Sequence, residues 1–477
     1  MFFMDEHLKQ LVWQGIAASN PWWETCHVPS IRSAGFRRHG FSQIYQAFRD
    51  SGQGRGVVLL GPRRVGKTVL MHQVVEQLLA DQVPPSAICM LSLDDVALRG
   101  QDLGALLDLV RVYQPYDGIR YLLLDEIQHS PEWSGWLKRL ADRKDPYVFL
   151  ATGSSAMSLR HGGQDAGVGR WREITLFPWS FREHVQLREH RSPVFDLIDT
   201  AIEQMVDIKG GSWVMHVHEE DMDLLNRALI DYLLRGGFPE AALASDLAES
   251  RRRLRQDILD RVLGRDIVDV TAVDPRLLER MFLRICLNPG GLWNSTEVAN
   301  DLGVSRPLVN RYLDVLERVF LVFRFPNLAS PYKGQPKIYL VSPSLRQALL
   351  GMTEEHLEIA EEWGRMSENA MAAALIGTRP AATAVGFWRK GNAECDGVVI
   401  NPGDVSEFIE TKRSGKKALR GIQRATEGLG VQNSWNVVLT RSVSYLAGDD
   451  SGVIQTPLAA WLYQQEAAAG GTLRISV

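Results

Sequence analysis

The sequence has few cysteines, no long apolar run and no strong excess of either charge. Its four cysteines lie far apart and include no CxxC pair, which argues against a zinc site and against a disulfide framework. The first residues, MFFMDEHLKQ, lack a basic start followed by an apolar core, so we expect no signal peptide. Runs such as GVVLLG are far shorter than a membrane span. These absences predict a cytoplasmic protein without a membrane partner.

The composition is that of an ordinary globular chain. Hydrophobic residues make up 45% and charged residues 23% of the 477 positions, which argues against a disordered chain and predicts about two to four domains. The net charge of −4 argues against wholesale coating by nucleic acid, but it does not exclude a local basic surface.

Strands and helices alternate in the first part of the chain. We expect strands at 56–60, 87–93, 121–124, 147–151 and 174–176, with helices such as 68–80 between them. This alternation predicts an α/β fold with a doubly wound parallel sheet. After residue 182 the strands stop, and the pattern to about residue 275 predicts helices. The first forty residues, rich in tryptophan, would pack on this core or mediate assembly.

A complete phosphate-binding signature, GPRRVGKT, follows the first strand and opens a helix. Gly61 and Gly66 allow the backbone to turn so that successive N–H groups face the phosphates. Lys67 is expected to reach the β- and γ-phosphates, and the Thr68 hydroxyl is expected to ligate Mg²⁺. We therefore predict ATP and Mg²⁺ as cofactors. The expected cofactor-binding residues are Gly61, Pro62, Arg63, Arg64, Val65, Gly66, Lys67, Thr68 and Val69.

The run YLLLDEIQ ends a second apolar strand in two acids. An acid at the tip of a buried strand beside a P-loop can hold Mg²⁺, which makes Asp125 a candidate metal ligand. Glu126 would orient or deprotonate the attacking water. The alternative is a strand that simply ends at an acidic turn.

Small polar residues and arginines follow the strand at 147–151. Ser154 is the candidate for a polar residue near the γ-phosphate, and Thr152 and Ser155 are its alternatives. One arginine of this region would act as an arginine finger on a neighbouring subunit. The candidates are Arg160, Arg170 and Arg172, with Arg170 preferred because it directly precedes the last strand. The alternative is that these arginines lie on the surface or face DNA.

The motifs GPRRVGKT, LLLDEIQ, TGSSA, the Gly-Arg before ITLFPWSFRE and the later RGGFPEA together resemble a known family. It is an AAA+-related branch of bacterial and archaeal P-loop ATPases with a C-terminal domain of unknown function. The resemblance extends from about residue 40 to about residue 424. It implies an AAA+ ATPase core, a helical lid, a winged helix, a nuclease-like end and a homo-oligomer. The expected boundaries are 1–40 for an N-terminal segment, 41–190 for the core, 191–274 for the lid, 275–345 for the winged helix and 346–477 for the nuclease-like domain.

The segment STEVANDLGVSRPLVNRYLDVLERVF predicts a helix-turn-helix, with helices at 295–302 and 306–319. Arg306, Asn310 and Arg311 would lie on the exposed start of the second helix, where recognition helices contact DNA. Residues 275–345 contain nine Lys or Arg against five Asp or Glu, an excess of four positive charges. DNA is therefore an expected partner. The alternative is that this unit binds a protein or forms the base of the lid.

Near the C-terminus, Glu368, Asp396, Glu410 and Lys412 resemble the PD-(D/E)xK nuclease core, a restriction-endonuclease-like α/β domain. Asp396 and Glu410 on adjacent strand ends can converge on one or two Mg²⁺ ions, with Glu368 completing the site. Glu410 and Lys412 share a strand face, so the lysine can activate the attacking water. Glu394 competes with Asp396 as a ligand. A basic run suited to a phosphate backbone follows: Lys412, Arg413, Lys416, Lys417, Arg420 and Arg424.

Together these patterns predict an ATPase whose hydrolysis cycle moves or gates a DNA-binding and nuclease-like C-terminal unit. Such a protein would suit defence against foreign DNA, mobile-element biology or repair. The alternative is a nucleotide-dependent regulatory switch. In that case the winged helix binds a protein and the nuclease-like domain is inactive.

Overall fold

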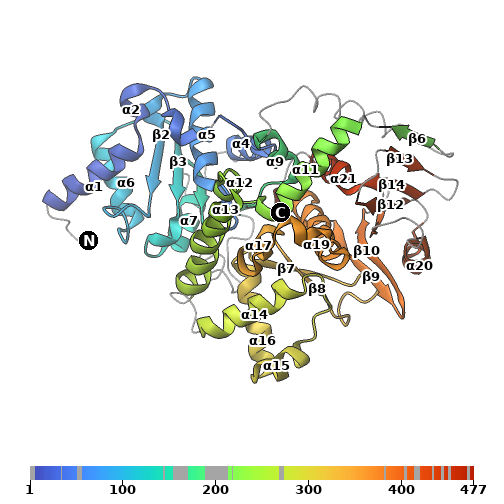
Figure 1. The fold of residues 1–477 in the computed structure, drawn as a ribbon. Helices are drawn as coiled ribbons and strands as arrows, with labels where there is room; N and C mark the ends of the chain where they lie inside the picture. The colour runs from blue at the N-terminus through green and yellow to red at the C-terminus, as the bar shows by residue number, and fades with distance from the viewer. Residues whose placement is uncertain are drawn as a thin grey trace. The chain divides into compact units, whose positions relative to one another are not determined.

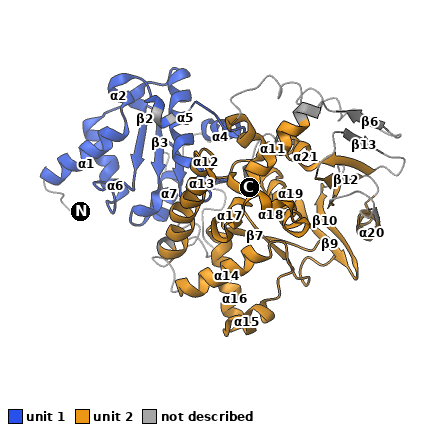
Figure 2. Cartoon of the chain, in the orientation of Figure 1, with its two compact units in different colours: residues 1–176, 475–477 blue, residues 177–474 orange. Residues whose placement is uncertain are grey.

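The chain forms two compact units, residues 1–176 with 475–477 and residues 177–474 (Figure 2). The computed structural model describes residues 6–33, 35–50, 56–142, 146–153, 170–188, 213–216, 219–267, 273–380, 383–401, 406–412, 419–431, 434–441, 445–448, 453–469 and 473–476. The finer division into core, lid, winged helix and nuclease-like domain stays a prediction.

The first unit is built on a parallel sheet. Its strands are β1 (Gly56–Leu60), β2 (Ile88–Ser92), β3 (Arg120–Asp125), β4 (Tyr147–Thr152) and β5 (Trp171–Leu176). They are ordered β5-β1-β4-β3-β2, all mutually parallel, and β15 (Leu473–Ser476) lies beside β5. The predicted α/β fold with a parallel sheet is thereby confirmed. Because β1, β4 and β3 are neighbours and run parallel, their C-terminal ends lie next to one another.

Helices cover both faces of this sheet (Figure 1). The helices are α1 (Glu6–Ser19), α4 (Phe41–Arg49), α5 (Lys67–Ala80), α6 (Leu103–Tyr113) and α7 (Trp133–Asp142). One core cluster joins α1, α6 and α7 to alternate strand residues such as Cys89, Leu91 and Leu122. This alternation is the side-chain period of a strand buried on both faces.

The N-terminal segment packs on the edge strand β2, which is one of the two roles expected for it. Besides α1 it contains α2 (Trp22–Thr25) and α3 (Ser30–Ser33). The buried amide of Asn20 donates to the Met90 carbonyl (2.7 Å) and accepts from the Met90 N–H (2.6 Å). The indoles of Trp22 and Trp23 both donate to the Ile88 carbonyl. The segment therefore satisfies backbone groups that an edge strand would otherwise leave open.

The second unit begins with helices. They are α9 (Phe181–Arg188), α11 (Glu219–Arg235), α12 (Pro239–Ala242) and α13 (Leu247–Arg253), followed by π-helical turns at Leu254–Asp260 and Val262–Asp266. The prediction of helices alone between residues 182 and 275 is wrong, because β6 (Trp213–His216) is a strand. It pairs with β13 (Tyr445–Gly448), far along the chain, so local periodicity carried no signal for it.

Three helices and a hairpin follow, and the second and third helices lie close to the ranges predicted for the helix-turn-helix. They are α14 (Pro275–Leu287), α15 (Ser295–Leu302), α16 (Arg306–Arg318), β7 (Val322–Phe325) and β8 (Lys337–Leu340). Asn294 caps α15 by accepting from the Thr296 N–H, and Gly303 ends it with φ 68°, a left-handed conformation that suits glycine. The two strands are antiparallel. Residues 326–336 connect them, which is long for a hairpin connection.

A seven-stranded mixed sheet forms the rest of the second unit. Its order is β6-β13-β14-β12-β11-β10-β9. The strands not yet given are β9 (Ala384–Lys390), β10 (Ala393–Ile400), β11 (Ser406–Thr411), β12 (Ser434–Thr440) and β14 (Val453–Pro457). The remaining helices are α17 (Ser344–Leu350), α18 (Glu354–Glu358), α19 (Ala360–Thr378), α20 (Leu419–Leu429) and α21 (Leu458–Ala469). Among the described residues of the chain, no helix has the length and apolar character needed to span a membrane.

Candidate functional site

The loop between β1 and α5 has a backbone that requires glycine at both ends. Gly61 has φ 150°, and a Cβ at this position would lie 2.3 Å from the carbonyl oxygen of Leu176. Gly66 has φ 93° where α5 begins, a conformation that L side chains rarely adopt. The loop thus leads into the N-terminus of a 14-residue helix, whose first N–H groups lack partners within the helix and favour an anion.

Lys67 is enclosed by this loop. The residue is 5% exposed, and its ammonium donates to the carbonyl oxygens of Gly61 (3.0 Å) and Pro62 (2.9 Å). A buried ammonium is stable only when polar groups surround it. Its position at the first turn of α5 therefore places one fixed positive charge inside the loop.

Asp125 connects three elements at the end of β3. It accepts hydrogen bonds from the hydroxyls of Thr68 on α5 (2.8 Å) and Thr152 at the end of β4 (2.5 Å). Thr152 in turn accepts from the backbone N–H of Glu126 (3.0 Å). The strand order β1-β4-β3 causes this meeting, because it places the last residue of β4 between the loop and the tip of β3.

Glu126 follows in a left-handed conformation, with φ 51°. Such a conformation is uncommon for a residue other than glycine and is typical of functional turns. The side chain accepts a hydrogen bond from Gln128. The turn therefore directs two successive carboxylates, those of Asp125 and Glu126, into different surroundings.

The two carboxyl groups differ in acidity. Burial, together with the negative charge of Glu126, raises the pKa of Asp125 to about 6, although the hydrogen bonds from the threonines oppose this. Burial would also raise the pKa of Glu126, but the positive charge of Lys67 and the Gln128 hydrogen bond hold it below its ordinary value. A cation beside Asp125 would favour its charged form.

The structure places the other candidates of this region only in part. Arg170 is half-exposed and forms an ion pair with Asp142 (2.8 Å), and Arg172 is exposed. Ser154, the preferred polar candidate, lies outside the described residues, as do Ser155 and Arg160. Its alternative Thr152 is fully buried and contacts Asp125.

Two residues near the loop were missed in the sequence. Arg38 is buried, and its guanidinium lies 3.5 Å from the carbonyl oxygen of Val65. Nothing in its segment signalled this, because it precedes the recognisable motif. Gln128 contacts Glu126 and stands within the run LLLDEIQ, so its place beside two acids was a usable signal.

A second polar cluster lies in the C-terminal sheet. Carboxylate oxygens of Glu368 on α19 and of Glu394 and Asp396 on β10 lie within 4.8 Å of one another, which makes them a possible set of cation ligands among the described residues. The β9–β10 ladder shifts register between Cys395 and Val398. Such a bulge redirects a side chain, and here it affects the position of Asp396.

Strand β11 adds its own charged pair to this cluster. The side chain of Asp396 accepts from the N–H and hydroxyl of Thr411 (both 2.9 Å). Lys412 lies 2.9 Å from Glu410 and 3.8 Å from Asp396. Burial, with the charge of Asp396, raises the pKa of Glu410 to about 8, and Lys412 opposes this. The structure therefore brings together Glu368, Asp396, Glu410 and Lys412, as the sequence pattern suggested, and it places the competing Glu394 beside them.

Lys337, which the sequence did not single out, lies in the same cluster. Its ammonium is 2.6 Å from Glu368 and 2.7 Å from Glu394. Of the basic run after Lys412, Arg413, Lys416 and Lys417 lie outside the described residues, and Arg420 and Arg424 are exposed on α20.

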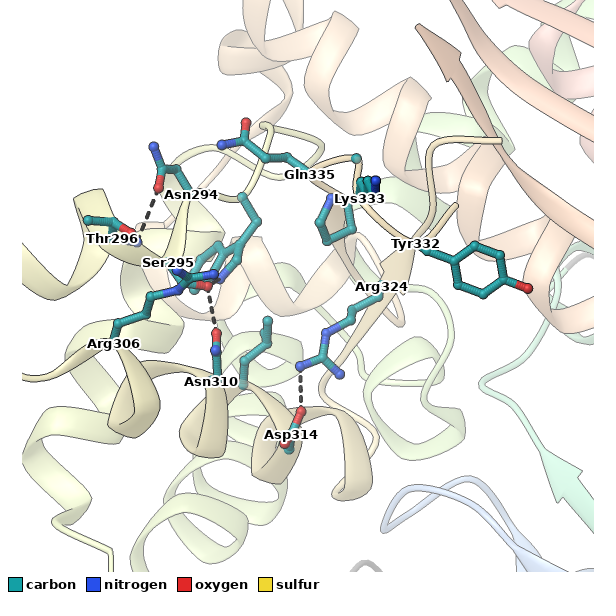
Figure 3. A pocket seen from close by; sticks show the side chains of 14 residues that line it. Asn294, Ser295, Thr296, Arg306, Asn310, Asp314, Arg324, Tyr332, Lys333 and Gln335 are labelled. Atoms are coloured by element: carbon teal, nitrogen blue, oxygen red, sulfur yellow. Dashed lines mark hydrogen bonds and ion pairs between the residues drawn. The ribbon is translucent and has the colours of Figure 1, made fainter. Parts of the chain in front are cut away.

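An open groove of about 650 Å³ lies in the second unit between α16 and the loop that leads to β8 (Figure 3). Arg306 and Asn310 line its α16 wall, and Lys333 lines the loop. Arg306 and Lys333 form no hydrogen bond or ion pair within the part of the chain that the structure describes, whereas Asn310 accepts from Ser295 (2.6 Å). Tyr332 on the loop is fully exposed.

Two families match parts of the chain. Residues 53–185 match a family described as an AAA domain, and residues 226–356 match one described as a domain of unknown function. An uncharacterised protein of Methanocaldococcus jannaschii is 22% identical over 321 residues, which cover 65% of this chain and 64% of that protein. The match thus spans less than two thirds of that relative. The P-loop segment is therefore similar to an AAA domain in sequence, and its loop has the backbone of a phosphate-binding loop.

Three solved structures show distant likenesses to the chain. A Walker-type ATPase of Pyrococcus abyssi has a TM-score of 0.39 and 13% identity, covering 65% of this chain and 95% of its own. PCH-2 of C. elegans has a TM-score of 0.23 and 13% identity, covering 65% and 71%. A DNA polymerase III gamma subunit-related protein of Thermotoga maritima has a TM-score of 0.24 and 12% identity, covering 58% and 97%. At such TM-scores these likenesses establish no shared function.

Proposed function

We propose that the chain hydrolyses ATP at the P-loop and uses this cycle to act on DNA. The observation that carries the first part is the contact between Thr68 and Asp125 (2.8 Å) beside the enclosed Lys67. A hydroxyl and a carboxylate at this spacing fit Mg²⁺, which prefers oxygen ligands. When bound, Mg²⁺ would neutralise the charge that develops on the phosphates.

The residues of the site divide this work. Backbone N–H groups from Arg63 to Val69 would bind the phosphates, and Lys67 would move from its loop carbonyls to the β- and γ-oxygens. Thr68 and Asp125 would hold the metal. Burial alone would raise the pKa of Glu126, but Lys67 and Gln128 hold it below its ordinary value. Glu126 therefore stays charged and can orient the attacking water. The test is ATP turnover by the full chain with Mg²⁺.

Two further parts of this site stay proposals. Ser154 would lie near the γ-phosphate. Arg170, already half-exposed beside Asp142, would leave that ion pair to reach the nucleotide of a neighbouring subunit, which requires a homo-oligomer. Ion pairs with half-exposed partners are weak, so the exchange costs little.

For the second unit we propose a winged helix that binds DNA and a PD-(D/E)xK-like domain that cleaves it. The groove supports DNA binding, because Arg306 and Lys333 offer two free positive charges among the described residues and Tyr332 offers an exposed ring (Figure 3). Positive side chains release counterions from phosphates, and aromatic rings stack on unpaired bases. Arg311 is exposed but does not line the groove.

Cleavage is supported by the C-terminal cluster. Asp396 and Glu410 would hold Mg²⁺, Lys412 would polarise the attacking water, and Glu368 would complete the arrangement. Asp396 and Glu410 fit a divalent cation, because burial and mutual repulsion oppose charge on both carboxylates when no cation is bound. The test is Mg²⁺-dependent cutting of DNA by the full chain, with Lys412→Ala expected to stop cutting and to spare ATP turnover.

One observation favours the alternative of a regulatory switch with an inactive nuclease-like domain. Lys337 and Lys412 already form ion pairs with Glu368, Glu394 and Glu410 and offset part of their negative charge. In this case the winged helix would bind a protein. If no DNA is cut and DNA leaves ATP turnover unchanged, the switch is the better account.

A further inference from the structure

Lys337 is a buried lysine between two carboxylates. It is the first residue of β8, 4% exposed, and its ammonium lies 2.6 Å from Glu368 and 2.7 Å from Glu394. Lysine is almost never this buried unless it is paired. The side chain is therefore a permanent cation within the acidic cluster.

The surroundings fix this cation in one place. The ammonium lies 5.1 Å from the centre of the Phe387 ring, a distance at which a ring face attracts a cation. Tyr339, two residues along the strand and hence on the same face, donates to the oxygen of Glu368 that also binds Lys337 (2.5 Å). Strand β8 thus presents two donors to Glu368, and the lysine has little freedom to leave.

The two carboxylates that hold the ammonium, Glu368 and Glu394, form with Asp396 a set of oxygens that are spaced like the ligands of a metal ion. Those of Glu368, Glu394 and Asp396 lie within 4.8 Å of one another, and oxygens bound to one Mg²⁺ or Ca²⁺ at about 2.0–2.6 Å from the ion are separated by about this much. We propose that Lys337 fills the place of a second divalent cation. The C-terminal site then takes a single metal ion, on Asp396 and Glu410.

The single metal ion on Asp396 and Glu410 rests on the proposed nuclease-like function. The role of Lys337 as a replacement for a second ion does not depend on that function. The ammonium supplies one positive charge that cannot dissociate, so Glu368 and Glu394 share a counter-charge at every metal concentration. A metal at Asp396 and Glu410 faces no competition from a second ion close by.

The test is Mn²⁺ binding and thermal unfolding of the full chain. All proteins carry Asp125→Asn, so that the ATP site lacks the carboxylate proposed to hold its metal ion. The variant Lys337→Met keeps the length of the side chain and removes its charge. In EDTA its Tm is expected to fall by roughly 5 °C or more, because two half-buried carboxylates lose the ammonium that they share. Mn²⁺ should restore most of this loss, and the number of bound ions should rise from one to two per chain.

Arg389→Met is the matched control. Arg389 is the other cationic partner of Glu394 (3.2 Å) but is half-exposed, so its loss should leave the chain with one bound ion and no restoration by Mn²⁺. Should Lys337→Met not fold, the double variant Lys337→Met with Glu368→Gln removes one acid together with the ammonium. It is expected to fold in EDTA and to bind a single ion.

The outcomes separate the two proposals. If Lys337→Met binds no additional Mn²⁺ and gains no stability from it, or if the parent already binds two ions, Lys337 is only a structural counter-charge. A second ion in the double variant would contradict the proposal as well. If the parent binds none and Lys337→Met binds one, the proposal for Lys337 stands and the metal site on Asp396 and Glu410 fails.

Discussion

The hydroxyl of Thr68 donates a 2.8 Å hydrogen bond to Asp125, a residue 57 positions further along the chain. The contact joins the first turn of the helix after the P-loop to the tip of β3. Both side chains are the oxygen ligands that the proposed Mg²⁺ site needs. Because the fold itself holds these two side chains together, the site is largely preorganised.

We therefore expect Thr68→Ala to reduce kcat for ATP by about 100-fold or more, a loss of the size seen when a preorganised polar group is removed from a catalytic site. Thr68→Ser, which keeps the hydroxyl, is the control and should retain most activity. Steady-state turnover at saturating Mg²⁺ measures both. Equal turnover by Thr68→Ala and the parent chain would remove Thr68 from the metal site.

The groove of the second unit gives a prediction about DNA. Replacing Arg306 or Lys333 by alanine should weaken binding of duplex DNA and reduce the slope of log affinity against log salt by about 1 for each. Arg280→Ala, an exposed arginine of α14 outside the groove, is the matched control. Fluorescence anisotropy across a salt series measures the slope. If all three variants bind alike, the groove is not the DNA contact.

His184 predicts how stability depends on pH. Its side chain is buried, with a ring nitrogen 3.0 Å from Asp231. Burial lowers the pKa of His184 below its ordinary value of 6.5, although the Asp231 carboxylate opposes this. The unfolded chain therefore binds a proton at His184 at a higher pH than the folded chain does, so the contribution of His184 to the free energy of unfolding falls as pH drops below about 6.5.

His72 and His129 shift in the same direction because of burial, so a variant is needed to isolate His184. His184→Gln should make the free energy of unfolding less dependent on pH between about pH 5 and 7. Urea unfolding at several pH values measures the slope, which an overall loss of stability does not affect. Identical slopes in the two proteins would show that His184 is not held neutral by its surroundings.

Asn20 gives a prediction about stability. Its amide pairs with both backbone groups of Met90 on the edge strand β2. Asn20→Ala would leave a buried N–H and a buried carbonyl without these partners, so we expect a loss of roughly 2–4 kcal/mol in the free energy of unfolding. Denaturant unfolding measures it, with the exposed Gln10→Ala on the same segment as control. A loss no greater than that of the control would mean that the segment does not protect the strand.

Sequence patterns predicted the first sheet well because its strands are buried on both faces. Val57, Val58 and Leu59 are wholly unexposed, and such strands form continuous apolar runs bounded by turns. The catalytic candidates of the ATPase domain stand at the ends of these runs, so the sheet topology alone brings Thr68, Asp125 and Thr152 together.

Features that depend on contacts between distant parts of the chain could not be predicted from local sequence patterns. Strand β6 pairs with β13, more than two hundred residues later in the chain, and its own residues show no distinctive period. A lysine at the start of a strand is usually exposed, so nothing marked Lys337 before β8 was placed against α19. The role of Asn20 depends equally on a strand seventy positions away.

The proposed ATP site depends most on Lys67, because its enclosed ammonium places a positive charge inside the P-loop. The most direct measurement is steady-state ATP turnover by the full chain with Mg²⁺, compared between the parent, Lys67→Ala and the control Lys138→Ala on α7. We predict that Lys67→Ala loses about 100-fold or more of the parent turnover, while Lys138→Ala keeps it and all three proteins share one circular dichroism spectrum. Undiminished turnover by Lys67→Ala, or no turnover by the parent chain, would contradict the account.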